Sequence, residues 1–289
     1  MRRQRRKWAY KEEAEDVPYF KITKDKKYAA QRKYNNMVKH AVIKRYLTGI
    51  RWLLDIGTGM GQEIGKYLSA KIRNVILMDR DQRALEIARK RVKRPLDAHF
   101  VLADVTAYNP SVMFSICSIR PGQVDAVVSN LAIHYFIWDQ HSLYRFIMLV
   151  KCTLKSGGLC MFTCMNGGKI HNLLRGINFG ETLELRSHRS ILTGDTMRYG
   201  IKRLYEECDE SLLGCKIAVS LPFIESDEMY EENLINIDYL CDEFKRYGFA
   251  LVGRNSFDST RLMATPPVLS PVERQWVSMY EWVILRKKK

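Results

Sequence analysis

A short apolar segment, residues 52–54, is followed by an acid and three glycines at alternate positions. The acid is Asp55, and the glycines are Gly57, Gly59 and Gly61. This pattern is typical of a buried strand that turns sharply into a helix and leaves bare backbone beside a ligand. A second apolar segment ends in Asp79, 22 residues after Gly57. A carboxylate at that place can accept hydrogen bonds from both hydroxyls of a ribose.

Two cofactor classes place an adenosyl ribose beside such an acid: the nicotinamide dinucleotides and S-adenosylmethionine (SAM). The pyrophosphate of a dinucleotide favours the spacing G-x-G-x-x-G, whereas this chain has G-x-G-x-G. Asp55 also favours SAM, because an acid is unfavourable beside pyrophosphate but useful near the amino end of a methionine moiety. A third apolar segment ends in Asp104, placed to accept from the adenine amino group, and a fourth ends in Asn130. SAM is therefore the predicted cofactor, and residues 131–135 are expected to meet the substrate.

Repeated strand and helix signals between residues 51 and 158 predict a Rossmann-like, doubly wound α/β domain with a mostly parallel sheet, the class I fold of SAM-dependent methyltransferases. Residues 155–158 are predicted as a turn before a fifth strand at 159–164. Residues 169–231 are predicted as an insertion after that strand. A helix near 237–247, a strand from 249, a loop at 265–271 and a last strand at 280–285 are expected to complete the domain.

The overall composition is typical of a soluble enzyme domain, with 289 residues of which 46% are hydrophobic. No apolar run approaches the roughly 18 residues of a membrane span. The first residues lack the apolar core of a secretory signal, and no membrane partner is expected. The seven cysteines include no C-x-x-C pair, so neither a zinc site nor a disulfide framework is expected, and a reducing compartment is.

The formal net charge of +15 predicts a polyanionic partner. Basic residues crowd the first 51 positions and return at 286–289, and aromatic residues such as Trp8 and Tyr10 lie among them. Cations beside rings that can stack on bases suit the 5′ end of an RNA. Residues 1–27 are therefore predicted as a basic arm, followed by a domain over 28–289. A solvated tail and a solvated amphipathic helix near 28–46 are the alternative interpretation.

Five segments match, in order, the motifs of one enzyme family. Residues 32–39 read R-K-Y-N-N-M-V-K, similar to R-x-x-N-N-x-x-K, and residues 55–63 read D-I-G-T-G-M-G-Q-E, similar to D-L-G-C-G-K-G-G-D. His134-Tyr135 matches F-x-x-H-Y, residues 232–235 match E-[YF]-L-V, and residues 278–281 match the final S-I-Y strand. The chain thus resembles the mRNA cap guanine-N7 methyltransferases, over nearly all of its length after residue 28. Within that family it is most similar to the methyltransferase module of a large-DNA-virus capping enzyme.

The strand ends and the resemblance together predict seven cofactor residues: Lys39, Asp55, Gly57, Gly59, Asp79, Asp104 and Asn130. The resemblance implies that five residues surround the capped guanosine: Asn36, His134, Tyr135, Glu232 and Tyr280. It also implies capped RNA as a partner, fused or associated triphosphatase and guanylyltransferase domains, and a stimulatory subunit as a candidate. A viral protein of this kind is expected in the cytoplasm, the viral factory or the virion, and a cellular one in the nucleus.

Two departures from the family pattern bear on the site. The family's lysine in the glycine turn is Met60 here, so a cation must come from elsewhere. The proline usually found before the guanine-binding glutamate is Glu231, which leaves Glu225, Glu231 and Glu232 as alternatives. The spacing to Tyr247-Gly248 favours Glu232.

The implied chemistry needs no metal and no catalytic base. Guanine N7 carries a free lone pair at neutral pH, so its methylation removes no proton, and catalysis rests on alignment and on accommodating charge on the purine. A carboxylate such as Glu232 can accept from guanine N1–H and the 2-amino group. The alternatives are a non-catalytic RNA-binding subunit with a degenerate SAM fold, and a methyltransferase for a small molecule or a protein.

Overall fold

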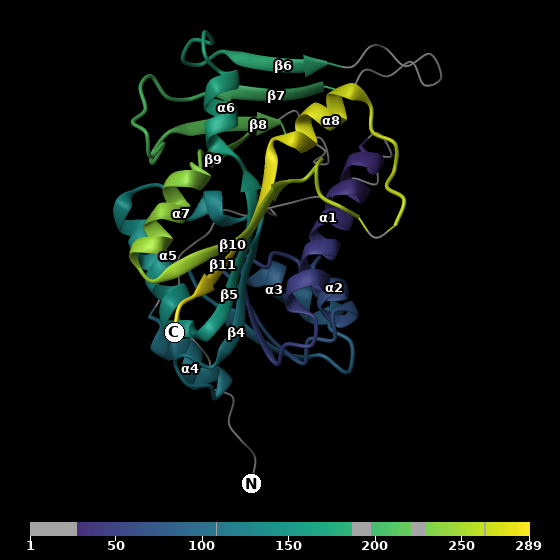
Figure 1. Ribbon diagram of the computed structural model, residues 1–289, viewed down its shortest axis with the longest axis vertical. Helices are drawn as coiled ribbons and strands as arrows, with labels where there is room; N and C mark the ends of the chain where they lie inside the picture. Colours follow the sequence, from purple (N-terminus) through teal and green to yellow (C-terminus); the bar gives the residue numbers. More distant parts are fainter. Residues whose placement is uncertain (1–27, 108, 187–197, 221–228, 263) are drawn as a thin grey trace.

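A seven-stranded sheet forms the centre of the computed structural model, which describes residues 28–107, 109–186, 198–220, 229–262 and 264–289 (Figure 1). The sheet order is β10-β11-β5-β4-β1-β2-β3. Its strands are β1 (Trp52–Ile56), β2 (Asn74–Asp79), β3 (Asp97–Leu102), β4 (Val124–Asn130), β5 (Leu154–Met165), β10 (Phe249–Ser256) and β11 (Tyr280–Lys287). β1 to β5 pair in parallel, and β11 runs antiparallel to both of its neighbours. The predicted doubly wound fold is confirmed, while the basic arm predicted over 1–27 lies outside the described residues.

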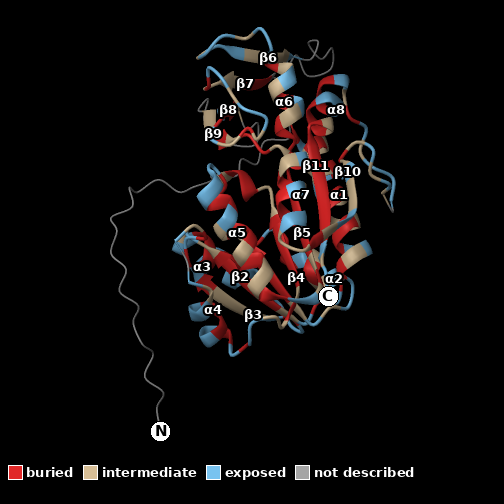
Figure 2. Cartoon of the chain, turned by 60° about the vertical axis from the view of Figure 1, so that its left-hand side comes forward, coloured by how far each residue is buried: buried red, intermediate tan, exposed pale blue. Residues whose placement is uncertain are grey.

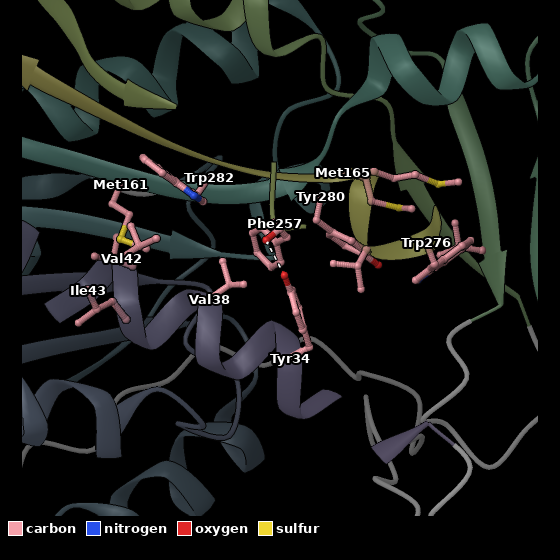
Figure 3. Packing of buried hydrophobic residues seen from close by; sticks show 14 of the residues in the cluster. Tyr34, Val38, Val42, Ile43, Met161, Met165, Phe257, Trp276, Tyr280 and Trp282 are labelled. Carbon is pink, nitrogen blue, oxygen red and sulfur yellow. Dashed lines mark hydrogen bonds between the residues drawn. The ribbon is translucent and has the colours of Figure 1, made fainter. Parts of the chain in front are cut away.

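Helices cover both faces of this sheet, because its central strands are apolar on both sides (Figure 2). One face packs against α1 (Ala29–Leu47), α2 (Ile64–Ser69), α3 (Gln82–Arg91) and α8 (Pro271–Ser278). The other packs against α4 (Pro110–Cys117), α5 (Gln140–Thr153) and α7 (Ile237–Arg246). Figure 3 shows Val38 and Val42 of α1 beside Met161 of β5. No helix among the described residues is long and apolar enough to cross a membrane.

The segment after β5 adds α6 (Gly167–Leu173) and a second, antiparallel sheet of four strands in the order β6-β7-β8-β9. These strands are β6 (Thr182–Arg186), β7 (Arg198–Arg203), β8 (Lys216–Ser220) and β9 (Met229–Asn233). They lie at one end of the molecule, next to α6 and α8 (Figure 1). The ring of Tyr199 on β7 stacks on Trp276 of α8, with centroids 4.6 Å apart. The insertion predicted after the fifth strand is thus a sheet that packs on the helices of the main domain.

Three local expectations were wrong. Residues 155–158, predicted as a turn before the strand, lie within β5, which starts at Leu154 and bulges between the Val124–Leu154 and Ala126–Leu159 pairs. The helices α4 and α8 were not expected, although Asn109 and Ser270 cap them and a proline follows each cap. Cys208 and Cys215 form a disulfide in the β7–β8 connection, where no disulfide was predicted. Their Cα atoms are 6.1 Å apart, within the ordinary span of such a bond.

Candidate cofactor and substrate site

The glycine turn after β1 packs directly against the segment that follows β4. Gly57 has a φ of +73°, and a Cβ at this position would lie 2.5 Å from the Cβ of Ala132. Asp55, 1% exposed, accepts a hydrogen bond from Thr58 Oγ1 at 2.9 Å. Burial raises the pKa of Asp55 to about 7. Asp55 therefore stabilises the glycine turn through its hydrogen bond with Thr58. Its predicted role in cofactor binding stays a prediction.

Asp79 stands at the carboxyl end of β2 with both carboxylate oxygens engaged by backbone amides. Oδ2 accepts from Gly59 N at 2.7 Å, and Oδ1 accepts from Asp81 N at 3.0 Å. Burial raises the pKa of Asp79, and these two bonds oppose that rise. Each carboxylate oxygen can accept a second hydrogen bond. The side chain is therefore held in one orientation and still has acceptor capacity for a diol.

Asp104 follows the carboxyl end of β3, and Asn130 ends β4; these strands flank the β1–β2 pair on its two sides. Asp104 is exposed, and its Oδ1 accepts from the backbone amide and the hydroxyl of Thr106 at 2.8 and 2.6 Å. Asn130 Nδ2 is buried without a hydrogen-bond partner among the described residues. The next residue, Leu131, has a φ of +52°. A left-handed conformation costs a residue with a Cβ roughly 1–2 kcal/mol and is often found beside functional sites.

A buried charge cluster joins α1 to α2 beside the glycine turn. Lys39 Nζ lies 2.5 Å from Glu63 Oε1, and Lys66 Nζ lies 2.8 Å from Glu63 Oε2. Lys66 Nζ also donates to Asn36 Oδ1 at 3.0 Å. Burial raises the pKa of Glu63, but Lys39 and Lys66 outweigh it and hold that pKa below its usual value. Two ammonium groups thus face one carboxylate, which leaves the cluster with an excess of positive charge.

A second buried carboxylate, Glu232 on β9, lies among histidine and tyrosine side chains. Its Oε1 is 3.4 Å from His134 Nε2 and 3.5 Å from the hydroxyl of Tyr135. Burial raises the pKa of Glu232 to about 8 and lowers the pKa of His134 to about 3. The pair therefore carries no imidazolium at neutral pH. Burial, and after it the negative charge of Glu232, raises the pKa of the Tyr280 hydroxyl. This hydroxyl therefore also lies near the carboxylate.

The structure brings together most, but not all, of the residues predicted for the substrate. His134, Tyr135, Glu232 and Tyr280 surround one another, whereas Asn36 accepts its hydrogen bond from Lys66 in the charge cluster. The register alternative Glu231 is 62% exposed at its side chain and pairs with Lys216, and Glu225 lies outside the described residues.

Sequence reasoning missed Glu63 and Lys66. The signal available was their three-residue spacing at the start of a helix, which places both on one side of α2.

The residues of the glycine turn and its surroundings fit SAM. The buried Nδ2 of Asn130 and the acceptor capacity of Asp79 suit an adenosyl base and ribose, while Asn130 Oδ1 accepts from Thr163 Oγ1 at 3.3 Å. The net positive Lys39–Glu63–Lys66 cluster suits the carboxylate of a methionine moiety.

The comparisons with known proteins define the class of the chain. A family model described as "Methyltransferase domain" matches residues 53–158. The crystal structure of a SAM-dependent methyltransferase from Clostridium acetobutylicum has a TM-score of 0.56 at 15% identity, and the alignment covers 90% of this chain and 92% of that one. Residues 53–158 therefore match a methyltransferase domain, the chain has the class I fold of SAM-dependent methyltransferases, and the predicted cofactor, SAM, is confirmed.

Relatives by sequence are enzymes of mRNA capping. The chain is 28% identical to the mRNA-capping enzyme of African swine fever virus (isolate Pig/Kenya/KEN-50/1950) over 93% of this chain and 32% of that enzyme. It is 27% identical to the mRNA cap guanine-N(7) methyltransferase of Saccharomyces cerevisiae over 44% of this chain and 30% of that protein. The resemblance predicted from the motifs is thus confirmed. The chain spans about a third of the length of the viral enzymes that it matches.

Proposed function

We propose that the chain transfers a methyl group from SAM to N7 of the guanine in a GpppN cap at the 5′ end of mRNA. The observation that carries this proposal is the buried carboxylate of Glu232 among His134, Tyr135 and Tyr280. Similarity to the yeast protein, whose name includes guanine-N(7), supports the choice of atom. SAM, when bound, supplies a methyl group on a sulfonium centre that an unprotonated ring nitrogen can attack.

Glu232 is suited to select and orient guanine. Its carboxylate can accept from N1–H and from the 2-amino group at once, and its negative charge favours the purine as positive charge develops on the ring. His134 is neutral because burial lowers its pKa to about 3, so it does not neutralise Glu232. The rings of Tyr135 and Tyr280 can stack on the base or define the walls of its pocket. The chain supplies orientation and electrostatics, and no group need remove a proton.

Lys66 is the candidate for the cation that Met60 does not provide. It is on the first helix after the glycine turn, only 12% exposed at its side chain, and it donates to Asn36. We assign Lys39 and Lys66 together to anionic groups of the two ligands: the methionine carboxylate and the cap phosphates.

The decisive experiment is transfer of labelled methyl from SAM to GpppA, followed by digestion and identification of the methylated nucleoside. The proposal requires label in 7-methylguanosine. Label in 2′-O-methyladenosine, or transfer to a small molecule or protein but never to GpppA, would contradict it. Binding of capped RNA without any transfer would indicate a non-catalytic subunit instead.

The pH dependence of the reaction should report the ionisation of Glu232. Its folded pKa is raised to about 8, and the carboxylate is the form that accepts from guanine. The value of kcat/KM for GpppA should therefore rise roughly 50-fold between about pH 6 and 8, as the carboxylate fraction grows. Initial rates at saturating SAM measure this. Glu232→Gln should flatten the profile, whereas Asp55→Asn should leave the rise in place, because Asp55 titrates beneath the glycine turn.

Deletion of residues 1–27 tests the proposed RNA contact of the basic arm. We expect the variant to bind a capped RNA of about 20 nucleotides less tightly, with little change for the cap dinucleotide, because the longer ligand supplies extra phosphates. The difference should shrink as salt rises, since counterion release drives such binding. Titrations of both ligands at several salt concentrations measure it. Equal losses for the two ligands at every salt concentration would assign the arm to folding.

A further inference from the structure

The turn between β5 and α6 contacts the chain beside both Glu232 and Tyr280. The backbone amide of Asn166 donates to the carbonyl of Met279 at 2.8 Å, directly before Tyr280. The next amide, that of Gly167, donates to the carbonyl of Ile235 at 2.8 Å, three residues after Glu232. Two consecutive amides therefore connect the start of β11 to the end of the second sheet.

Gly167 packs directly against the backbone of Ile235, in the segment that follows β9. A Cβ on Gly167 would lie 2.7 Å from the N, C and O atoms of Ile235, closer than real Cβ contacts. Ile235 is itself 3% exposed, so it has little room to move away. The absence of a side chain at this position thus sets how closely the strand bearing Glu232 can approach the main sheet.

A buried carboxylate on β11, that of Glu281, also holds the turn between β5 and α6 in place. Glu281, 5% exposed, accepts from Asn166 Nδ2 at 2.8 Å, from Lys169 Nζ at 3.0 Å and from Arg254 Nε at 2.6 Å. Burial raises the pKa of Glu281, but these three donors outweigh it and hold the pKa below its usual value. Asn166 Oδ1 also accepts from the amide of Lys169 at 3.1 Å, which caps α6. Every polar group of the Asn166 side chain is thereby oriented.

We propose that Glu281 is a positioning residue for guanine recognition, which acts through Asn166 and Gly167 on the spacing between Glu232 and Tyr280. The inference rests on the proposed function. Adjacent residues of a strand project to opposite faces, so the side chains of Glu281 and Tyr280 lie on opposite faces of β11. Its effect on the substrate must therefore pass through the turn.

Glu281→Gln is the primary test, because it keeps the volume but presents an amide donor to three donors. We expect the KM for GpppA to rise about tenfold, with the Kd of SAM within about twofold of wild type. Glu243→Gln is the matched control: Glu243 is equally buried at 3% and paired with Arg246 at 2.5 Å, but it lies on α7. The control should lower the melting temperature comparably and leave the KM for GpppA unchanged. Asn166→Ser, which retains a helix cap but loses the donor to Glu281, is the milder variant, and about a threefold rise in KM is expected.

A double-mutant cycle with Glu232→Gln separates positioning from general support of the fold. If Glu281 acts on Glu232, then Glu281→Gln should add less than about a twofold loss in kcat/KM once Glu232 has been replaced. Losses that multiply, or a SAM affinity that falls together with the affinity for GpppA, would overturn this inference while leaving the proposed function intact. A wild-type chain that neither binds nor methylates GpppA would overturn the proposed function and this inference with it.

Discussion

Glu232→Gln should lower kcat/KM for GpppA by roughly 30- to 1,000-fold, about 2 to 4 kcal/mol of transition-state stabilisation. The substitution keeps the volume of the side chain. It replaces one of the two acceptor oxygens by a donor, which would then face a donor of guanine, and it removes the charge that favours the methylated ring. SAM affinity should stay nearly unchanged, because the proposed ribose and adenine acceptors lie elsewhere: Asp79 at the end of β2 and Asp104 just after β3. Steady-state kinetics with GpppA and calorimetry with SAM measure the two effects.

The neighbouring glutamate is a matched control for this experiment. Glu231 is on the same strand but 62% exposed at its side chain, and it pairs with Lys216 at 3.2 Å. Glu231→Gln is expected to stay within about twofold of wild type, since exposed ion pairs contribute little. Full activity of Glu232→Gln combined with inactivity of Glu231→Gln or Glu225→Gln would place the guanine-binding carboxylate elsewhere in this segment. If all three variants are active, the guanine-binding site does not lie in this segment.

Asp79→Ala should weaken the binding of SAM and of its demethylated product by about 1.5 to 3 kcal/mol, roughly 10- to 150-fold in Kd. The variant loses two charge-assisted hydrogen bonds to the ribose. It also frees the amide of Gly59, which the carboxylate holds at 2.7 Å, so the glycine turn becomes less ordered. Calorimetric titration measures the loss.

Asp97→Ala serves as the control for Asp79→Ala. Asp97 is the first residue of β3, at the amino end of the strand, and its side chain is 71% exposed. Its SAM affinity should match that of wild type. Binding of NAD in place of SAM by the wild-type chain would contradict the assignment of the cofactor.

The main sheet could be predicted from the sequence because each of its strands is indicated by residues that are neighbours in the chain. Apolar segments that end in Asp79, Asp104 and Asn130 needed no knowledge of distant residues, and parallel pairing then placed all three at one edge. The glycine turn was recognisable for the same reason, since each of its positive-φ positions strongly favours a glycine at that position itself.

The candidate substrate site could be predicted only through a family resemblance, because it depends on contacts between distant segments. His134 and Glu232 are 98 residues apart in the chain and meet because β9 returns to the main domain. No periodicity in the chain reports such a contact. The ion pair between Lys39 and Glu63, which joins α1 to α2, is likewise a contact that the sequence does not indicate. The close contact of Gly167 with Ile235 also becomes apparent only in the folded structure. The start of β5 was mispredicted for a related reason: Leu154 already pairs with Val124 of β4, so the residues between Leu154 and Leu159 form a bulge within the strand instead of a turn before it.

The hydrogen bond from the amide of Gly167 to the carbonyl of Ile235 joins the two ends of the segment that contains α6 and the second sheet. A segment whose two ends already touch can lengthen, shorten or diverge with little entropic effect on the chain around it. In this protein that segment carries Glu232, the proposed guanine-binding residue, whereas the residues proposed to hold SAM belong to the main sheet and to α1 and α2. Recognition of the acceptor and retention of the donor are thus separable during evolution, and a methyltransferase of this design can acquire a new substrate without rebuilding its cofactor site.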